Sequence, residues 1–223
     1  MGASKRTATR RKRPLSRERI LRAALALADR DGIAAVTMRR VAGRLGVEAM
    51  SLYNHVQNKD DLVDGIIDLV VSEIELPKPG GDWRDAMRRR AVSTHDVLLR
   101  HPWAAQLVGS RPSPGPAMLR YVDATLACLV EAGFSYALAD HAWNAMDNHI
   151  YGFTVQELRF PFEPDEYAEV AKASLDLIPA EQYPHLRALA QEVISGRHSG
   201  LHDFTLGLDL ILDGLERLRA PGG

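Results

Sequence analysis

Residues 37–56, TMRRVAGRLGVEAMSLYNHV, constrain the fold more than any other stretch, because their pattern indicates two short helices joined by a tight turn. Thr37 is a good N-cap for the first helix, since its hydroxyl can accept a hydrogen bond from the free N–H groups of the first turn. Gly46 would end that helix, because glycine adopts a positive φ without steric cost. With Val47 as the apolar plug of the turn, a second short helix is expected at about 48–55. The pattern predicts a helix-turn-helix.

The second helix would have an unusual outward face. Leu52 would point inward, while the opposite face would carry small, hydroxyl, amide and aromatic groups, namely Ala49, Met50, Ser51, Tyr53, Asn54 and His55. Such groups fit a DNA major groove: Ser51 and Asn54 can bond base edges, and Tyr53 and His55 can reach phosphate. From spacing alone, an ordinary helical hairpin packed in an all-α core is the alternative.

The segment TMRRVAGRLGVEAMSLYNHVQNKDDLVDGI resembles the DNA-binding segment of the tetracycline-repressor (TetR) family. The resemblance covers about residues 15–70, and the LGV turn, the Leu-Tyr-x-His-Val end and the following Asn-Lys make it specific. It implies that Arg39 touches DNA near the start of the first helix, and that Lys59 clamps a phosphate at the start of the next. The full set of DNA-contacting residues that it implies is Arg39, Ala49, Met50, Ser51, Tyr53, Asn54, His55 and Lys59.

Charge is distributed very unevenly along the chain. The formal net charge is only −1, yet residues 1–59 hold 14 Lys/Arg and 4 Asp/Glu, and residues 60–223 hold 14 and 25. A run of charge is ordinarily just a solvated surface. Here the basic excess coincides with the helix-turn-helix, which favours a nucleic-acid interface confined to one end of the chain.

The remaining composition is that of a globular protein, 46% hydrophobic and 26% charged. No apolar run approaches eighteen residues, so no transmembrane helix is expected. The basic N-terminus has no apolar segment after it and does not resemble a secretory signal. A single cysteine, Cys128, excludes an intramolecular disulfide and fits a reducing, cytoplasmic location.

The chain divides into three predicted parts. Residues 1–14 would be a disordered basic arm, either lying along phosphates or the minor groove, or acting only as a solubilising tail. Residues 15–60 would be the helix-turn-helix DNA-binding domain, and residues 61–223 a helical ligand-binding and dimerisation domain. A long helix at about 58–75 would connect the two.

The C-terminal part contains only helical patterns, so the predicted fold class is all-α. After the connecting helix, helices are expected at 82–100, at a short segment opened by Pro102, and at 117–132, 135–157, 165–177, 183–195 and 202–219. The region resembles the TetR type of C-terminal domain, most clearly in GSRP at 109–112 and AGF at 132–134. The resemblance here is weaker and shorter than in the DNA-binding segment.

The resemblance also implies a homodimer whose interface is a four-helix bundle, and we assign 135–157 and 202–219 to it. The last helix is apolar over a broad stripe, although an internal core helix would show the same pattern. Dimerisation has a physical purpose, because two half-sites about 34 Å apart make a DNA site far more specific than one.

Members of the family usually bind a small-molecule effector in the C-terminal domain and then release DNA. Polar and aromatic residues among core positions are the clue to such a pocket. The predicted ligand-binding residues are Trp103, Gln106, Leu107, Ser110, Trp143, Asn144, Asp147, Asn148 and Tyr151. Ordinary core, capping or solvated roles are the alternative for each.

One departure from the family narrows the effector. In tetracycline-binding members a histidine just ahead of the GSRP-like segment holds a magnesium–drug chelate, assisted by an acidic residue. The matching positions here are Leu107 and Gln156, and neither is a metal-binding group of that kind. We therefore expect no metal or cofactor, and an effector more apolar than magnesium–tetracycline.

The sequence thus predicts a dimeric, ligand-responsive transcriptional repressor that binds double-stranded DNA and has no enzymatic activity. No HExxH, GxSxG, GxGxxG or Walker motif is present, and the eight histidines have no convincing metal-ligand spacing. Three alternatives stay open: an activator or co-ligand-dependent regulator of the same fold, a non-specific architectural DNA protein, and an all-α enzyme.

Overall fold

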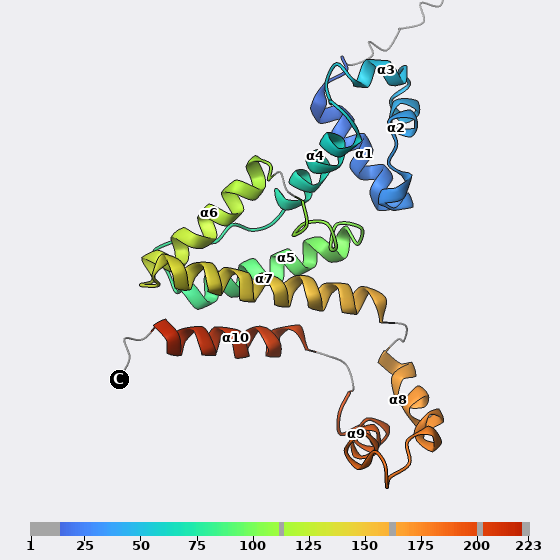
Figure 1. Cartoon of the computed structure of the whole chain (residues 1–223), viewed down its shortest axis with the longest axis vertical. Coiled ribbons are helices and arrows are strands. Elements are labelled where there is room, and N and C mark those ends of the chain that lie inside the picture. The colour runs from blue at the N-terminus through green and yellow to red at the C-terminus, as the bar shows by residue number, and fades with distance from the viewer. Residues whose placement is uncertain (1–13, 112–113, 161–163, 200–202, 220–223) are drawn as a thin grey trace, which may run out of the picture. The chain divides into compact units, whose positions relative to one another are not determined.

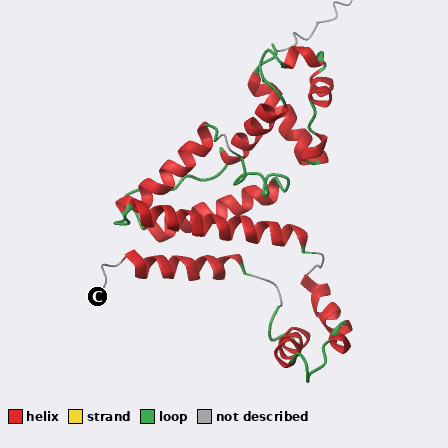
Figure 2. Cartoon of the chain, in the orientation of Figure 1, coloured by secondary structure: helices red, strands yellow, loops and turns green. Residues whose placement is uncertain are grey.

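The structure, a computed structural model, describes residues 14–111, 114–160, 164–199 and 203–219, so the predicted basic arm lies almost wholly outside it. Every regular element within these ranges is a helix (Figure 2), which confirms the all-α prediction. The α-helices, labelled in Figure 1, are α1 (Arg17–Asp31), α2 (Met38–Leu45), α3 (Ala49–Leu52), α4 (Lys59–Val71), α5 (Trp83–Arg100), α6 (Pro116–Glu131), α7 (Tyr136–Arg159), α8 (Pro164–Ala173), α9 (Pro184–Ile194) and α10 (Phe204–Arg219). Two 3-10 turns, η1 (Ile33–Ala35) and η2 (Leu175–Leu177), complete the set.

The chain forms two compact units that do not follow chain order. The first contains Met1–Ile74 and Asp96–Asp123, and the second contains Glu75–His95 and Ala124–Gly223. Helices α5 and α6 therefore each contribute residues to both units. No described helix is both long and apolar enough to cross a membrane.

The helices of the first unit start and stop where local chemistry dictates. The side chains of Ser16, Thr37 and Asn58 each accept a hydrogen bond from the backbone N–H three residues later, as N-caps do. Gly46 ends α2 in the left-handed region, with φ of +67°. The predicted helix-turn-helix is therefore present, with α2 and α3 as its two helices.

The core of the first unit joins α1 to the helix-turn-helix and to α4. Its fully buried members include Ile20, Ala24, Val36, Val41, Leu52, Leu62 and Ile66. Helices α1 and α4 approach closely at Gly65, where an added Cβ would lie 2.5 Å from Leu21 Cδ2. The absence of a side chain at Gly65 is what permits this spacing.

Two predicted elements differ from the structure. The regular part of α3 covers only four residues, and turns continue it toward residue 55. The short helix predicted to begin at Pro102 is wrong, because residues 102–110 form consecutive turns. Several hydrogen bonds there span three residues, such as Ala104 N to His101 O at 2.8 Å and Leu107 N to Ala104 O at 2.8 Å, and they close turns instead of a regular helix.

In the second unit, α5 and α10 are antiparallel and joined by charged side chains. Arg84 pairs with Asp213 at 2.5 Å, and one helical turn later Arg88 pairs with Asp209. The Trp83 indole donates to Glu216 at 3.0 Å. Helix α10 also lies alongside α7 (Figure 1), and these contacts bury Leu208, Leu212 and Leu215 on one side of α10. Residues 164–199 form a separate helical hairpin in which α8 packs on α9.

Candidate nucleic-acid interface

The outward face of α3 is open to solvent. Met50 is 75% exposed and Tyr53 is 46% exposed, while Leu52 between them is fully buried. Asn54 is also exposed, and Ala49, Ser51 and His55 are half-buried at the surface. Among the six residues predicted to face DNA, Ala49 packs against the core with part of its surface exposed, and the other five do not belong to the core. This surface is free to enter a groove, as base reading requires.

Two exposed cations lie on the helices that precede and follow α3 in the chain. Arg39 lies in the first turn of α2 and Lys59 begins α4, and neither forms an ion pair with any residue that the structure describes. Arg40, the neighbour of Arg39, differs because it pairs with Asp31. Hydrogen bonding from Arg30 lowers the pKa of Asp31 to about 2, with Arg40 adding to the effect. Arg39 and Lys59 therefore keep their charge available for phosphate.

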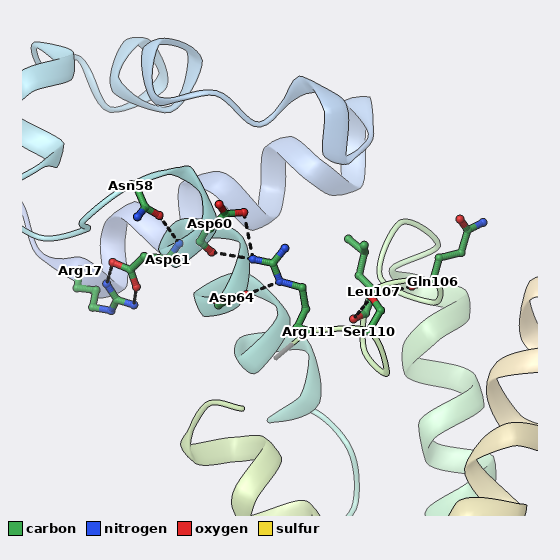
Figure 3. A network of polar contacts seen from close by, with 9 residues as sticks. All are labelled: Arg17, Asn58, Asp60, Asp61, Asp64, Gln106, Leu107, Ser110 and Arg111. Carbon is green, nitrogen blue, oxygen red and sulfur yellow. Dashed lines mark hydrogen bonds and ion pairs between the residues drawn. The ribbon is translucent and has the colours of Figure 1, made fainter. Parts of the chain in front are cut away.

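A residue outside the predicted set fixes the end of the recognition helix. Arg17 of α1 donates to the His55 carbonyl oxygen at 3.1 Å and to both carboxylate oxygens of Asp61, at 2.6 and 3.0 Å. Asp61 in turn accepts from the Gln57 backbone N–H at 2.8 Å. The hydrogen bonds between the two side chains raise the pKa of Arg17 and lower the pKa of Asp61. Figure 3 shows the contact of Arg17 with Asp61, and Asn58 at the start of α4.

No local sequence pattern indicates this role of Arg17. Arg17 stands at the start of α1 among other basic residues, and Asp61 lies 44 residues away in the chain. Only the packing of α1 against α4 makes them neighbours.

Acidic side chains of α4 contact Arg111 and the first turn of α6. Arg111 Nε lies 2.5 Å from Asp64, and its Nη2 lies 3.2 Å from Asp60 (Figure 3). The hydrogen bond to Asp64 is the largest cause that raises the pKa of Arg111. Asp68 accepts from the backbone N–H groups of Ala117 and Met118 at 2.9 and 3.1 Å, and so caps the N-terminus of α6. These contacts tie α4 to Arg111 and to the first turn of α6 within the first unit.

Four of the predicted ligand-binding residues lie in the turns at 102–110. The Trp103 indole donates to Asp29 Oδ1 of α1 at 2.8 Å. Gln106 is exposed and Leu107 half-buried, and the Ser110 hydroxyl donates to the Leu107 carbonyl oxygen at 3.1 Å (Figure 3). They therefore share one segment, adjacent to Arg111.

The other five lie on α7 in the second unit, and three of them converge. The Asp147 carboxylate accepts from the Trp143 indole at 2.7 Å and from the Tyr151 hydroxyl at 3.1 Å. It also pairs with Arg90, a fully buried arginine of α5 that the sequence interpretation overlooked. Asn144 and Asn148 are exposed and lie outside this cluster. The ligand-binding role of all nine residues stays a prediction.

The described residues contain no group of three or more His, Cys, Asp or Glu side chains placed to hold a metal ion. At the two positions that match the family's metal-binding groups, Leu107 is half-buried and Gln156 is exposed. Cys128 is buried, and burial raises the pKa of its thiol.

Comparisons with known proteins agree with this geometry. The family profile "Bacterial regulatory proteins, tetR family" matches residues 20–66, and the profile "Tetracyclin repressor-like, C-terminal domain" matches residues 76–219. A HTH-type transcriptional regulator of Saccharopolyspora erythraea is 41% identical over 145 residues, which are 65% of this chain and 61% of that protein. The HTH-type transcriptional repressor DrrR1 of Streptomyces coeruleorubidus is 31% identical over 216 residues, covering 92% of this chain and 79% of the relative.

Among solved structures, the TetR family protein ActR of Streptomyces coelicolor in complex with actinorhodin is similar over 94% of this chain and 100% of its own. The TM-score is 0.80 and the sequence identity is 29%. The likeness therefore extends over both compact units.

Proposed function

This chain belongs to the tetracycline-repressor (TetR) family of bacterial transcriptional regulators, and from that premise we propose that it represses transcription until a small-molecule effector releases it from operator DNA. The observation that carries the proposal is the exposed face of α3, together with the exposed Arg39 and Lys59 on the neighbouring helices of the chain. Ser51 and Asn54 would read base edges, Ala49 and Met50 would allow close approach, and Tyr53, His55 and the two cations would hold phosphates. The role is regulatory, with no substrate turned over, and it is carried out in the cytoplasm, where bacterial DNA lies.

We assign different functions to the parts of the chain before and after residue 60. Residues 15–60 contact DNA, and residues 61–223 bind the effector and a second copy of the chain. Two copies are needed because a single recognition helix buries too little surface to be specific. The exposed leucines of α10 support the dimer: Leu206 is 60% exposed, Leu210 68% and Leu218 66%. We place α7 and α10 in the interface.

Release would work through a choice between two geometries. An effector that binds the non-DNA geometry more tightly shifts the population toward it, so effector and DNA weaken each other's binding reciprocally. The predicted ligand-binding residues of the segment 103–110 directly precede Arg111, which forms ion pairs with Asp60 and Asp64 of α4. A ligand that moves this segment would move α4, and a movement of α4 would change the position of α3.

The effector would be bound without a metal. Leu107 and Gln156 supply no chelating group of the tetracycline-binding kind. The similar protein ActR was solved with actinorhodin, which supports a small-molecule effector for this chain as well. A screen for compounds that release the operator would identify the effector.

The test is selection of bound duplexes from a random pool, followed by a screen for compounds that release the selected operator. We expect a two-fold symmetric site whose half-sites lie about one helical turn apart. Binding that is unchanged when the selected site is scrambled would show a non-specific DNA protein and would refute the proposal. A footprint that lies upstream of the promoter and is needed for transcription would show an activator.

A further inference from the structure

The recognition helix exposes one large apolar side chain. Met50 is 75% exposed, more than any other large apolar residue that the structure describes in the first unit. The other apolar side chains of α2 and α3 are either buried in the core or packed against it, and Met50 does not belong to that core. Because the burial of apolar surface is favourable, Met50 gains free energy only when another molecule covers it.

Asn54 lies on the same side of the helix as Met50. Residues four apart face the same way, and these two lie nearly opposite the fully buried Leu52 around the helix axis. The chain continues to wind past the regular part of α3, because the N–H groups of His55 and Val56 both donate to the Leu52 carbonyl oxygen, at 2.9 and 3.0 Å. Asn54 is exposed, as Met50 is. One apolar and one amide side chain therefore share the outward face.

The chemistry of methionine limits what Met50 can recognise in a DNA groove. Its thioether has no donor and is only a weak acceptor, so it cannot read the hydrogen-bonding groups of the base edges or hold a phosphate. In the major groove, the apolar group that distinguishes one base from another is the 5-methyl group of thymine. The amide of an asparagine pairs with N6 and N7 of adenine. Met50 and Asn54 together therefore match A·T base pairs.

We propose that Met50 is a specificity-determining residue, which contacts the 5-methyl group of a thymine in each half-site of the operator. This role rests on the proposed function, since it requires α3 to lie in the major groove. A·T pairs are then expected at the positions that Met50 and Asn54 face. The exposed cations Arg39 and Lys59 cannot supply this preference, because phosphate contacts carry no sequence information.

The test removes the methyl group from the DNA. In the operator selected from the random pool, each thymine is replaced in turn by deoxyuridine, which keeps the O4 acceptor and the pairing with adenine but lacks the methyl group. Affinity is measured by fluorescence anisotropy for the wild type and Met50→Ala. We expect one thymine position in each half-site at which the wild type loses about fourfold per methyl group removed, the effect of one apolar carbon. Met50→Ala should bind the unmodified operator more weakly and should not respond to the substitution at that position.

Leu119→Ala is the matched control. Leu119 is 58% exposed on α6, outside the helix-turn-helix, so this variant should respond to deoxyuridine as the wild type does. Because the side chain of Met50 is exposed, Met50→Ala should also unfold at the wild-type temperature, measured by circular dichroism. A lower thermal midpoint would show that Met50 supports the fold, and would contradict the assigned role.

Met50→Gln separates the apolar contact from the length of the side chain. Glutamine is unbranched and of similar length, but its amide is polar. This variant should therefore lose the response to methyl removal, as Met50→Ala does. A Met50→Gln chain that responds like the wild type would overturn the proposal, because the response would not depend on an apolar group.

The remaining outcomes distinguish this role from the proposed function. Wild-type binding that is unchanged at every deoxyuridine position, or an equal loss in Met50→Ala, would overturn the role of Met50 and leave operator binding intact. A selected half-site without any thymine would do the same. Failure of the selection to yield any operator would instead refute the proposed function, and the role of Met50 with it.

Discussion

Met50 and Leu52 are two residues apart in the recognition helix, yet one is 75% exposed and the other is fully buried. The difference arises because α3 presents one face to the core of the first unit and the other to solvent. Leu52 anchors the helix, and the residues around it are left free to contact DNA. Leu52 thus contributes to the orientation of the exposed face of α3, together with the contact of Arg17 at the end of the helix.

At the residue scale, we predict that Ser51→Ala combined with Asn54→Ala lowers the preference for the operator more than the total affinity for DNA. Base contacts contribute about 1–3 kcal/mol of discrimination each, whereas phosphate contacts are the same on every sequence. Binding to operator and to random DNA is compared by fluorescence anisotropy. The matched control is Ser195→Ala with Gln191→Ala, two exposed residues of the second unit. Equal losses on both DNAs would refute base reading.

Arg39→Ala and Lys59→Ala should act differently. Each removes one exposed cation, so affinity should fall on all sequences, and the slope of log K against log salt should decrease by about 1. The measurement is a salt titration of operator and random DNA. Lys172→Ala, which removes an exposed lysine of α8, should leave the slope unchanged. A loss confined to the operator would contradict a phosphate role.

At the scale of elements, two glycines near the turn between α2 and α3 offer a matched pair. An added Cβ would meet no atom within 4 Å at either Gly43 or Gly46, so only backbone conformation distinguishes them. Gly46 has a φ of +67°, whereas Gly43 lies inside α2. Gly46→Ala should therefore cost about 1 kcal/mol of unfolding free energy, and Gly43→Ala should add about 0.5–1 kcal/mol. Chemical denaturation measures both, and effects of the same sign would contradict the assigned turn.

At the scale of the whole molecule, α10 has two apolar faces, and the residues that the structure describes cover only one of them. Leu208 and Leu212 are fully buried, while Leu206 and Leu210 are 60% and 68% exposed. Leu206→Glu with Leu210→Glu should therefore give a monomer, because the proposed interface would have to bury two charges. The operator affinity should fall about a hundredfold or more as the two linked half-site contacts become independent.

Sedimentation measures the oligomeric state of this variant, and Leu119→Glu is the control. Leu119 is 58% exposed on α6, outside the proposed interface, so its substitution should change neither mass nor affinity. A wild-type chain that is monomeric at micromolar concentration, or a double variant that still dimerises, would rule out the α10 interface.

What the sequence by itself determined is local. The caps at Ser16, Thr37 and Asn58, the stop at Gly46 and the apolar periodicity act within one turn of a helix, so the printed residues suffice to place the helix-turn-helix and the all-α class. Where local patterns were ambiguous, as after Pro102, the sequence predicted a helix and the chain forms turns.

Only the tertiary structure decided which charged groups meet. Arg17 finds Asp61 across 44 residues, Arg90 finds Asp147 across 57, and His101 finds Asp29 across 72. From the sequence alone, each partner has the pattern of an ordinary surface residue. Periodicity indicates which face of a helix is apolar, but it does not indicate which other helix will pack against that face. Burial strengthens the pair of Arg90 with Asp147, since charges removed from water must be compensated by a specific neighbour, whereas the pair of Arg17 with Asp61 is partly exposed. The exposed face of α3 could therefore be predicted from the sequence. The ion pairs and hydrogen bonds that hold it in position depend on how the helices pack.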